Sequence, residues 1–184
     1  MKEICVCGRG GQGSLVLAQF MAIAALEDNK YGQAFPFLGG GGERRGKPIM
    51  AFCRLDDAPI RVRSRVSQAD YLIIQDPTIF KEEPVLERVK SNGLVIANTD
   101  KKPQELNLPE NIWVFTIPAE KLARKILGRP IINTALLGTF GALTKELSLE
   151  AIVNAVQKKF PGHLGEKNAE VVKQAYKEVS GGIS

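Results

Sequence analysis

The chain has 184 residues, of which 44% are hydrophobic and 24% are charged, a composition that supports one globular domain with a buried core. No apolar run approaches the roughly 20 residues of a membrane-spanning helix, and residues 1–8 lack the pattern of a secretion signal. The three cysteines are an odd number without paired spacing, which favours reduced thiols. We therefore expect a cytoplasmic protein without a membrane anchor.

Positive charge is concentrated in one short window of the chain. The sequence has 25 basic and 20 acidic residues, and residues 44–65 account for the whole net charge of +5. A local excess favours a local anionic partner, such as phosphate groups or an acidic protein face. It argues against a nucleic-acid binder, whose charge would be spread more widely. The basic residues of this window are Arg44, Arg45, Lys47, Arg54, Arg61, Arg63 and Arg65.

The chain begins with a predicted strand, a glycine loop and a predicted helix. Residues 2–7 form a short apolar stretch, and residues 14–27 are apolar nearly all round, as in a buried helix. The loop between them reads "GRGGQG", with the G-x-G-x-x-G spacing of a dinucleotide site. Its glycines permit a tight turn and close approach of a phosphate to the start of the helix. The loop consists of Gly8, Arg9, Gly10, Gly11, Gln12 and Gly13.

The second half of the dinucleotide fingerprint is missing. An acidic residue should end the next strand and bind the ribose, but Glu27 and Asp28 lie at the predicted end of the helix instead. Arg9 and Gln12 also place large polar groups in the loop. We therefore interpret the loop as a folding or partner-facing element, with NAD or another phosphate ligand as the alternatives.

A predicted hairpin follows an irregular stretch over residues 28–47. Residues 48–55 and 58–64 read as two strands joined by a tight turn. In the second strand, alternation places Arg61 and Arg63 on one face. Like charges on one face repel, so together with the arginines of residues 44–45 they favour an anion-binding role.

The remaining chain alternates strands with helices. This order predicts an α/β fold, a three-layer sandwich with a Rossmann-like, mostly parallel sheet and an inserted β-hairpin. We expect one domain over residues 1–184, with the helices from about residue 133 packed on the same core. Asn133 or Thr134 is the predicted cap of the first of these helices. The expected strands are 71–75, 93–98 and 112–117, and the expected helices are 118–127, 133–147, 148–160 and 164–179.

Few side chains are suited to catalysis. Cys5 and Cys7 share one strand face and Cys53 lies on another strand, without the spacing of a metal or cluster site. His163, the single histidine, precedes the last helix, where a capping or surface role fits it. No Ser-His-Asp or Cys-His set can be built. We expect no catalytic residue and no metal ligand in this chain.

Six motifs in series resemble a known family, the gamma subunits of the 2-oxoacid:ferredoxin oxidoreductases, with the pyruvate enzyme as the closest variant. The resemblance implies membership of a complex that converts a 2-oxoacid and CoA into acyl-CoA and carbon dioxide while reducing ferredoxin. In such a complex alpha and beta subunits hold thiamine diphosphate with Mg²⁺, a delta subunit carries iron–sulfur clusters, and the gamma subunit is non-catalytic. The motifs are "GRGGQG", "YGQAFPF", "ERRGKPIMAFCRLDDAPIRVRS", "ADYLIIQDPT", "GRPIINTALLGTF" and "FPGHLGEKN".

The resemblance also assigns roles to residues. In fused single-chain relatives the loop that matches residues 43–46 lies in the domain associated with CoA binding, which implies that Arg44 and Arg45 contact CoA phosphates. The glycine loop at residues 8–13, together with Arg61, Arg63 and Asn133, becomes a candidate subunit-facing region. The alternatives are a free-standing NAD(P)-binding oxidoreductase and a phosphate- or nucleic-acid-binding module.

Overall fold

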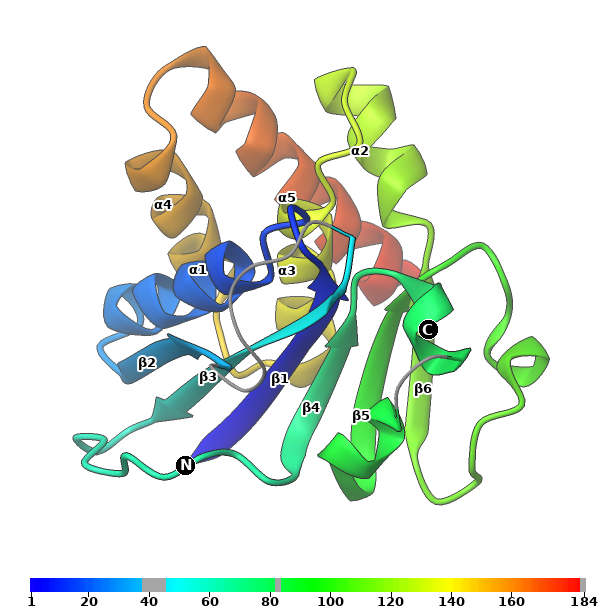
Figure 1. The fold of residues 1–184 in the computed structure, drawn as a ribbon. Helices are drawn as coiled ribbons and strands as arrows, with labels where there is room; N and C mark the ends of the chain where they lie inside the picture. The colour runs from blue at the N-terminus through cyan, green and yellow to red at the C-terminus, as the bar shows by residue number, and fades with distance from the viewer. Residues whose placement is uncertain (38–45, 82–83, 183–184) are drawn as a thin grey trace.

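A mixed β-sheet forms the centre of the molecule in the computed structural model, which describes residues 1–37, 46–81 and 84–182 (Figure 1). Within these residues the sheet has six strands in the order β2-β3-β1-β4-β5-β6. All strands except β3 run in one direction, because β3 is antiparallel to both β1 and β2 while β4, β5 and β6 follow β1 in parallel. The strands are β1 (Lys2–Arg9), β2 (Tyr31–Pro36), β3 (Pro48–Asp56), β4 (Ala69–Ile74), β5 (Val89–Asn98) and β6 (Trp113–Ile117).

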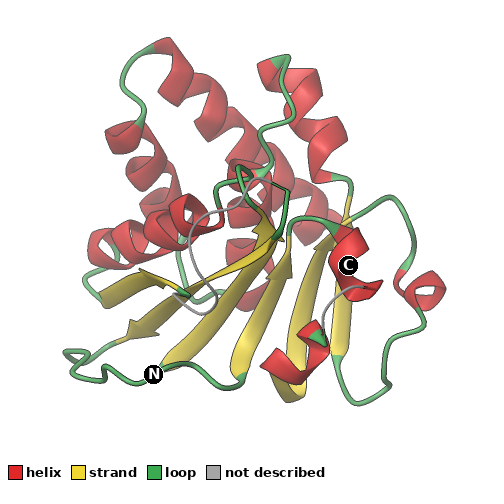
Figure 2. Cartoon of the chain, viewed as in Figure 1, coloured by secondary structure: helices red, strands yellow, loops and turns green. Residues whose placement is uncertain are grey.

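The α-helices cover one face of the sheet, and three short 3-10 turns lie on the other (Figure 2). Side chains from each α-helix join the first core with Ile4 and Val6 of β1. The second core contains Cys5 and Cys7 of the same strand, together with residues of the 3-10 turns. The helices are α1 (Ser14–Glu27), α2 (Ala119–Leu127), α3 (Asn133–Thr144), α4 (Leu149–Lys159) and α5 (His163–Gly182), and the turns are η1 (Pro77–Lys81), η2 (Val85–Arg88) and η3 (Pro103–Leu106).

The α/β class and the mostly parallel sheet are therefore confirmed, while the layers are arranged differently from a regular Rossmann fold. The third layer consists of 3-10 turns and irregular chain rather than α-helices. The helices α3, α4 and α5 contribute residues to the same core as α1 and the strands. No helix among residues 1–37, 46–81 and 84–182 has the length and apolarity needed to cross a bilayer.

The inserted hairpin is present, but its strands are not the predicted ones. Residues 58–64 form no strand, and β3 pairs with β2 on one side and β1 on the other. Both hydrogen-bonding edges of β3 are thus occupied, so no edge remains for residues 58–64. The partner of β3 in the hairpin is β2, within the stretch 28–47 that we expected to be irregular.

A smaller correction concerns the start of α3. Ile132 occupies the cap position, and the Asn133 side chain does not cap the helix. It turns instead toward the glycine loop, where it contacts the backbone of Gln12 and Gly13. The predicted helix start at residue 133 is otherwise confirmed.

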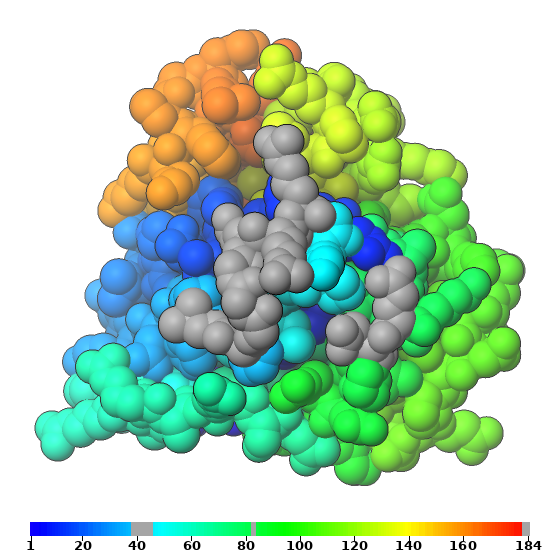
Figure 3. Space-filling model, viewed as in Figure 1, coloured from blue at the N-terminus to red at the C-terminus, as the bar shows by residue number. Residues whose placement is uncertain are grey.

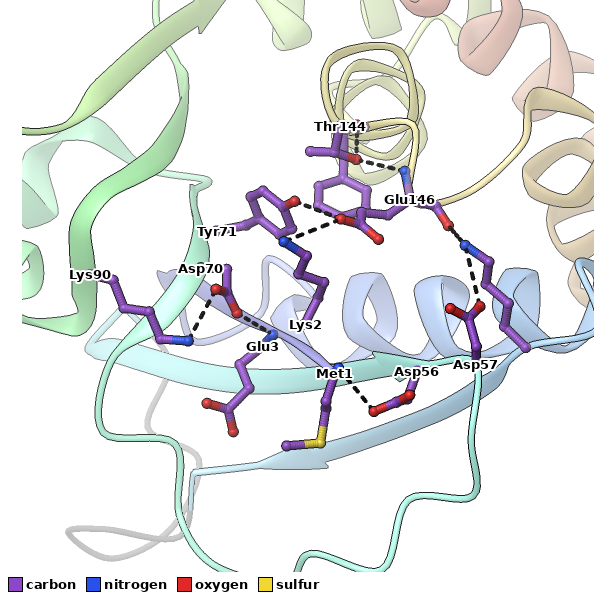
Figure 4. A network of polar contacts seen from close by, with 12 residues as sticks. Met1, Lys2, Glu3, Asp56, Asp57, Asp70, Tyr71, Lys90, Thr144 and Glu146 are labelled. Carbon is purple, nitrogen blue, oxygen red and sulfur yellow. Dashed lines mark hydrogen bonds and ion pairs between the residues drawn. The ribbon is translucent and has the colours of Figure 1, made fainter.

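A polar cluster at the amino-terminal edge of the sheet ties the helices to the strands (Figure 4). The Tyr71 hydroxyl donates to Glu146 Oε1 over 2.7 Å, which joins β4 to the loop after α3. Partial burial and this carboxylate raise the pKa of Tyr71. On the same edge Asp70 accepts from the backbone N–H of Glu3 at 2.8 Å and pairs with Lys90 at 3.0 Å. These contacts are internal and hold the architecture together.

Candidate functional site

The glycine loop lies at the point of the sheet where α/β proteins usually bind ligands. From β1 the chain continues through α1 to β2 and β3 on one side of the sheet, whereas from β4 it continues to β5 and β6 on the other (Figure 1). A crevice forms where two neighbouring parallel strands send their connections in opposite directions, at their carboxyl ends. Gly8 and Arg9 end β1 at this point and residues 10–13 follow it, while Gln75 and Asp76 follow β4 beside them.

The glycines of the loop allow the chain's own side chains to approach its backbone. A Cβ atom on Gly8 would lie 2.2 Å from Gln75 Oε1, and one on Gly13 would lie 2.8 Å from Asn133 Nδ2. Gly13 also has a φ of 78° where the helix α1 begins, a conformation that favours glycine. The space that a dinucleotide phosphate would use is therefore next to protein amides.

The side chains of Ser14, Gln75 and Asn133 form a buried network of hydrogen bonds. Ser14 Oγ donates to Gln75 Oε1 over 2.6 Å, and Gln75 Nε2 donates to Asn133 Oδ1 over 2.6 Å. Asn133 Nδ2 in turn donates to the carbonyl of Gln12 at 3.3 Å. Ser14 and Gln75 are at most 1% exposed and Asn133 is 8% exposed. Buried polar groups that are mutually satisfied fix a single loop conformation.

Arg9 carries the charge of the loop, and its guanidinium is bound within the chain. Its Nε lies 3.0 Å from Asp76 Oδ2, Nη1 donates to the carbonyl of Gly46 at 2.9 Å, and Nη2 donates to the hydroxyl of Thr78. Partial burial acts to raise the pKa of Asp76, but hydrogen bonds from Thr78 and the charge of Arg9 outweigh it and hold that pKa below its ordinary value. This pair joins the glycine loop to the chain that follows β4.

The residues predicted for the subunit-facing region thus fall into two groups, those buried inside the chain and those at least partly exposed. Gly8 and Asn133 are buried and make contacts inside the chain, so they support the loop rather than form its outer surface. Gly11 is exposed, and Arg9, Gly10, Gln12 and Gly13 are half-buried. The sequence singled out the loop, but it gave no signal for Gln75, which connects both halves of the network.

A second feature of the structure argues against a dinucleotide site. The strand after α1 ends in Phe35 and Pro36 rather than in an acidic residue that could bind a ribose. This strand, β2, is also separated from β1 by β3, whereas the fingerprint needs the two strands to be neighbours. The ribose-binding half of an NAD site is therefore not assembled.

One arginine of the predicted basic window lies inside the protein rather than on its surface. Arg44 and Arg45 lie outside the described residues, and Arg61 and Arg63 are exposed. Arg54, which the sequence analysis counted with the basic window, is 1% exposed and pairs with Glu3 at 3.0 Å. The two residues face each other in the ladder between β1 and β3, a pairing that no spacing in the sequence reveals.

The cysteines lie inside the molecule, and the single histidine lies on its surface. Cys5, Cys7 and Cys53 are buried and form no disulfide, and burial raises the pKa of Cys53. His163 is exposed at the start of α5, 3.5 Å from Glu166. In the described part of the chain no three His, Cys, Asp or Glu residues are grouped as a metal site requires.

Comparison with known proteins places the whole chain in one group. The family model for pyruvate ferredoxin/flavodoxin oxidoreductase matches residues 3–178. Pyruvate synthase subunit PorC of Methanosarcina barkeri is 46% identical over 98% of both chains. The pyruvate/ketoisovalerate oxidoreductases common subunit gamma of Thermococcus kodakarensis is 40% identical over 96% of both. The crystal structure of pyruvate oxidoreductase subunit PORC from Thermotoga maritima superposes with a TM-score of 0.81 at 30% identity, over 96% of this chain and 97% of that one.

Proposed function

Since the chain belongs to the pyruvate ferredoxin/flavodoxin oxidoreductase family, we propose that it is the non-catalytic gamma subunit of a heteromeric 2-oxoacid:ferredoxin oxidoreductase, with pyruvate as the substrate. The complex makes acyl-CoA and carbon dioxide from the 2-oxoacid and CoA and passes the electrons to ferredoxin. The matches cover 98% and 96% of this chain, so the gamma role is proposed for the whole sequence given. A free-standing NAD(P) enzyme or a nucleic-acid module is not favoured.

The observation that carries the proposal is the state of the glycine loop. Gln75, Asn133 and Arg9 hydrogen-bond around it, so protein contacts fix its conformation. An α/β subunit whose loop is held in this way, and which lacks the ribose-binding half of a dinucleotide site, is suited to a structural place beside subunits that carry out the chemistry. The exposed part of the loop, around Gly11, is the part we assign to a subunit contact.

The cofactors of the complex are assigned to partner subunits. The described residues do not fit a magnesium ion or an iron–sulfur cluster, because no three metal-binding side chains are grouped among them. We assign thiamine diphosphate and Mg²⁺ to alpha and beta subunits and the clusters to a delta subunit. The contribution of this chain is then assembly. Its three cysteines form no disulfide, which fits a reducing cytoplasm.

Contact with CoA is proposed for Arg44 and Arg45 alone, on the resemblance of residues 43–46 to the loop of the fused enzymes. In the assembled enzyme, Ala at both positions should raise the KM for CoA and leave the KM for pyruvate unchanged. Arginine forks suit phosphate groups, so a lysine pair should restore part of the loss. Unchanged CoA kinetics would remove this assignment and leave the gamma role intact.

The proposed function is tested by reconstitution. This chain, the partner subunits from the same host, and the mixture are each assayed for pyruvate- and CoA-dependent reduction of ferredoxin. We expect the chain alone to be inactive, to co-purify with the partners, and to be required for a stable, fully active complex. Turnover by the isolated chain, or a complete and stable complex without it, would contradict the proposal.

A further inference from the structure

The chain between β3 and β4 carries a row of exposed arginines, which we call the arginine segment (residues 59–65). Arg61, Arg63 and Arg65 are all exposed, and Val62 between them is 37% exposed. The segment runs along the surface at the lower edge of the molecule, in teal in Figure 3. No regular secondary structure holds it there.

A buried arginine holds the segment in place from the inside. Arg54 Nη1 donates to the carbonyl of Val62 at 3.2 Å, and its Nη2 donates to the carbonyl of Ser64 at 2.6 Å. The same guanidinium pairs with Glu3 and lies 5.0 Å from the ring centre of Phe35. These two hydrogen bonds hold the backbone at Val62 and at Ser64, where the chain bends, so this part of the segment is positioned before any partner binds.

Neighbouring charges do not neutralise these arginines. Among the described residues, no carboxylate lies within ion-pair distance of Arg61, Arg63 or Arg65. The two acidic residues just before the segment are paired elsewhere, Asp56 with the amino group of Met1 at 3.0 Å and Asp57 with Lys30 at 4.0 Å. Within the described part of the chain, the segment therefore presents three positive charges that are not paired with a carboxylate.

The shape of the segment indicates what kind of partner it fits. Residues two apart in extended chain are separated by at most about 7 Å, which sets the spacing of Arg61 and Arg63, and the bend at Ser64 turns the chain before Arg65. Within the described residues, the backbone of residues 59–65 makes no hydrogen bond to another backbone group. Its outward N–H and C=O groups can therefore pair with an extended stretch of another protein chain. A nucleic acid would need a broader basic surface than this row.

We propose that the arginine segment is a preorganised docking surface for an acidic, extended stretch of a partner subunit. The inference rests on the proposed gamma role and adds to it a site and a chemistry of contact. Arginine suits this contact because its fork binds carboxylates in a bidentate manner. Arg54 and Glu3 position the segment without touching the partner.

The test uses the complex co-expressed from its own subunits and purified through a tag on a partner subunit. Retention of this chain is measured along a salt gradient for the wild type, for R61E/R63E/R65E and for R61K/R63K/R65K. The control R129E/K173E/K177E makes the same change in net charge at exposed residues outside the segment. Circular dichroism and thermal unfolding establish that each variant is folded.

We expect charge reversal in the segment to lower the affinity of this chain for its partner subunits at least tenfold. The lysine variant should lose less affinity, and the control should be retained as the wild type is. Retention of R61E/R63E/R65E equal to that of the control would overturn the docking surface, and the arginines would then only keep the segment soluble. Oligonucleotide binding is measured for the same variants. If R61E/R63E/R65E loses oligonucleotide binding but is still retained by the partner subunits, the docking surface is overturned in favour of a nucleic-acid partner. If the wild type itself is not retained, the gamma role fails first.

Discussion

Arg54 combines two tasks at one position, because it pairs with Glu3 and also binds the carbonyls of the arginine segment. Replacing it with methionine keeps much of the volume but leaves a half-buried carboxylate and two carbonyls without their donor. We expect Arg54→Met to lower the free energy of unfolding by about 2–4 kcal/mol. Urea unfolding followed by circular dichroism measures this loss.

The exposed pair between Arg124 and Glu120 on α2 gives the matched control, since both side chains are more than half exposed. Arg124→Met should cost less than about 0.5 kcal/mol. Adding Glu3→Gln to Arg54→Met should recover part of the stability, because the uncompensated charge is removed. Equal effects of the two methionine substitutions would mean that Arg54 is an ordinary surface residue energetically.

The carboxylate of Asp76, beside the glycine loop, makes the free energy of unfolding depend on pH. Its pKa is held below the ordinary value, so the folded chain binds the proton less readily than the unfolded chain does. The resulting stabilisation is fully present above the unfolded pKa of about 3.9 and is lost as pH falls through the lower, folded value. We expect Asp76→Asn to be less stable than wild type by about 1–2 kcal/mol at neutral pH, with the gap closing below pH 4.

Unfolding in urea at a series of pH values from neutral to acid checks this dependence. Asp57→Asn serves as the control, since its carboxylate is 89% exposed and only reaches Lys30 at 4.0 Å. The control should follow the wild-type curve at every pH. A constant gap between Asp76→Asn and wild type across the acid range would show that the contact with Arg9 and Thr78 is not coupled to protonation.

At the scale of elements, the close packing of α3 on α5 depends on one glycine. A Cβ atom on Gly138 would lie 2.4 Å from the carbonyl oxygen of Val172, which is backbone and cannot turn away. Gly138→Ala should therefore destabilise the protein by about 1–3 kcal/mol despite alanine's better helix propensity. Gly181, near the end of α5, has open space around its Cβ position. Gly181→Ala should leave the thermal midpoint unchanged or raise it slightly, and a fall of the same size in both variants would contradict the packing argument.

The sequence predicts some elements well for a physical reason. Strands β1, β4 and β5 are central and buried on both faces, so continuous apolar runs mark them, and the helices from α2 to α5 were placed within a few residues. β2 was missed because it is an edge strand whose residues are at most half-buried. Residues 58–64 have the alternation of a strand, but Arg54 binds the carbonyls at Val62 and Ser64 and both edges of β3 are already paired.

In the candidate site too, the sequence predicts local features but not contacts between residues far apart in the chain. The glycine loop and the basic window are visible as local composition, so the sequence located both. The contacts that decide their roles join residues far apart in the chain, Gln75 with Asn133 and Arg54 with Glu3. Such pairs exist only once the order of strands is fixed, and a single sequence carries no signal for them.

At the scale of the whole molecule, the fold resembles a nucleotide-binding sheet that lacks the ribose-binding half of the site, and this leads to the last prediction. We expect neither NAD nor NADP to bind the isolated chain with a dissociation constant tighter than about 1 mM. The reason is structural: Gln75 and Asn133 occupy the space beside the loop glycines, and β3 separates β2 from β1. Calorimetric titration of the folded chain measures the affinity.

The control variant Asn133→Ala removes one amide from the network and should gain no cofactor binding, because the ribose-binding half of the site is still missing. Saturable micromolar binding of either nucleotide to the wild type would mean that the loop opens in solution, and that this subunit has a ligand of its own within the complex.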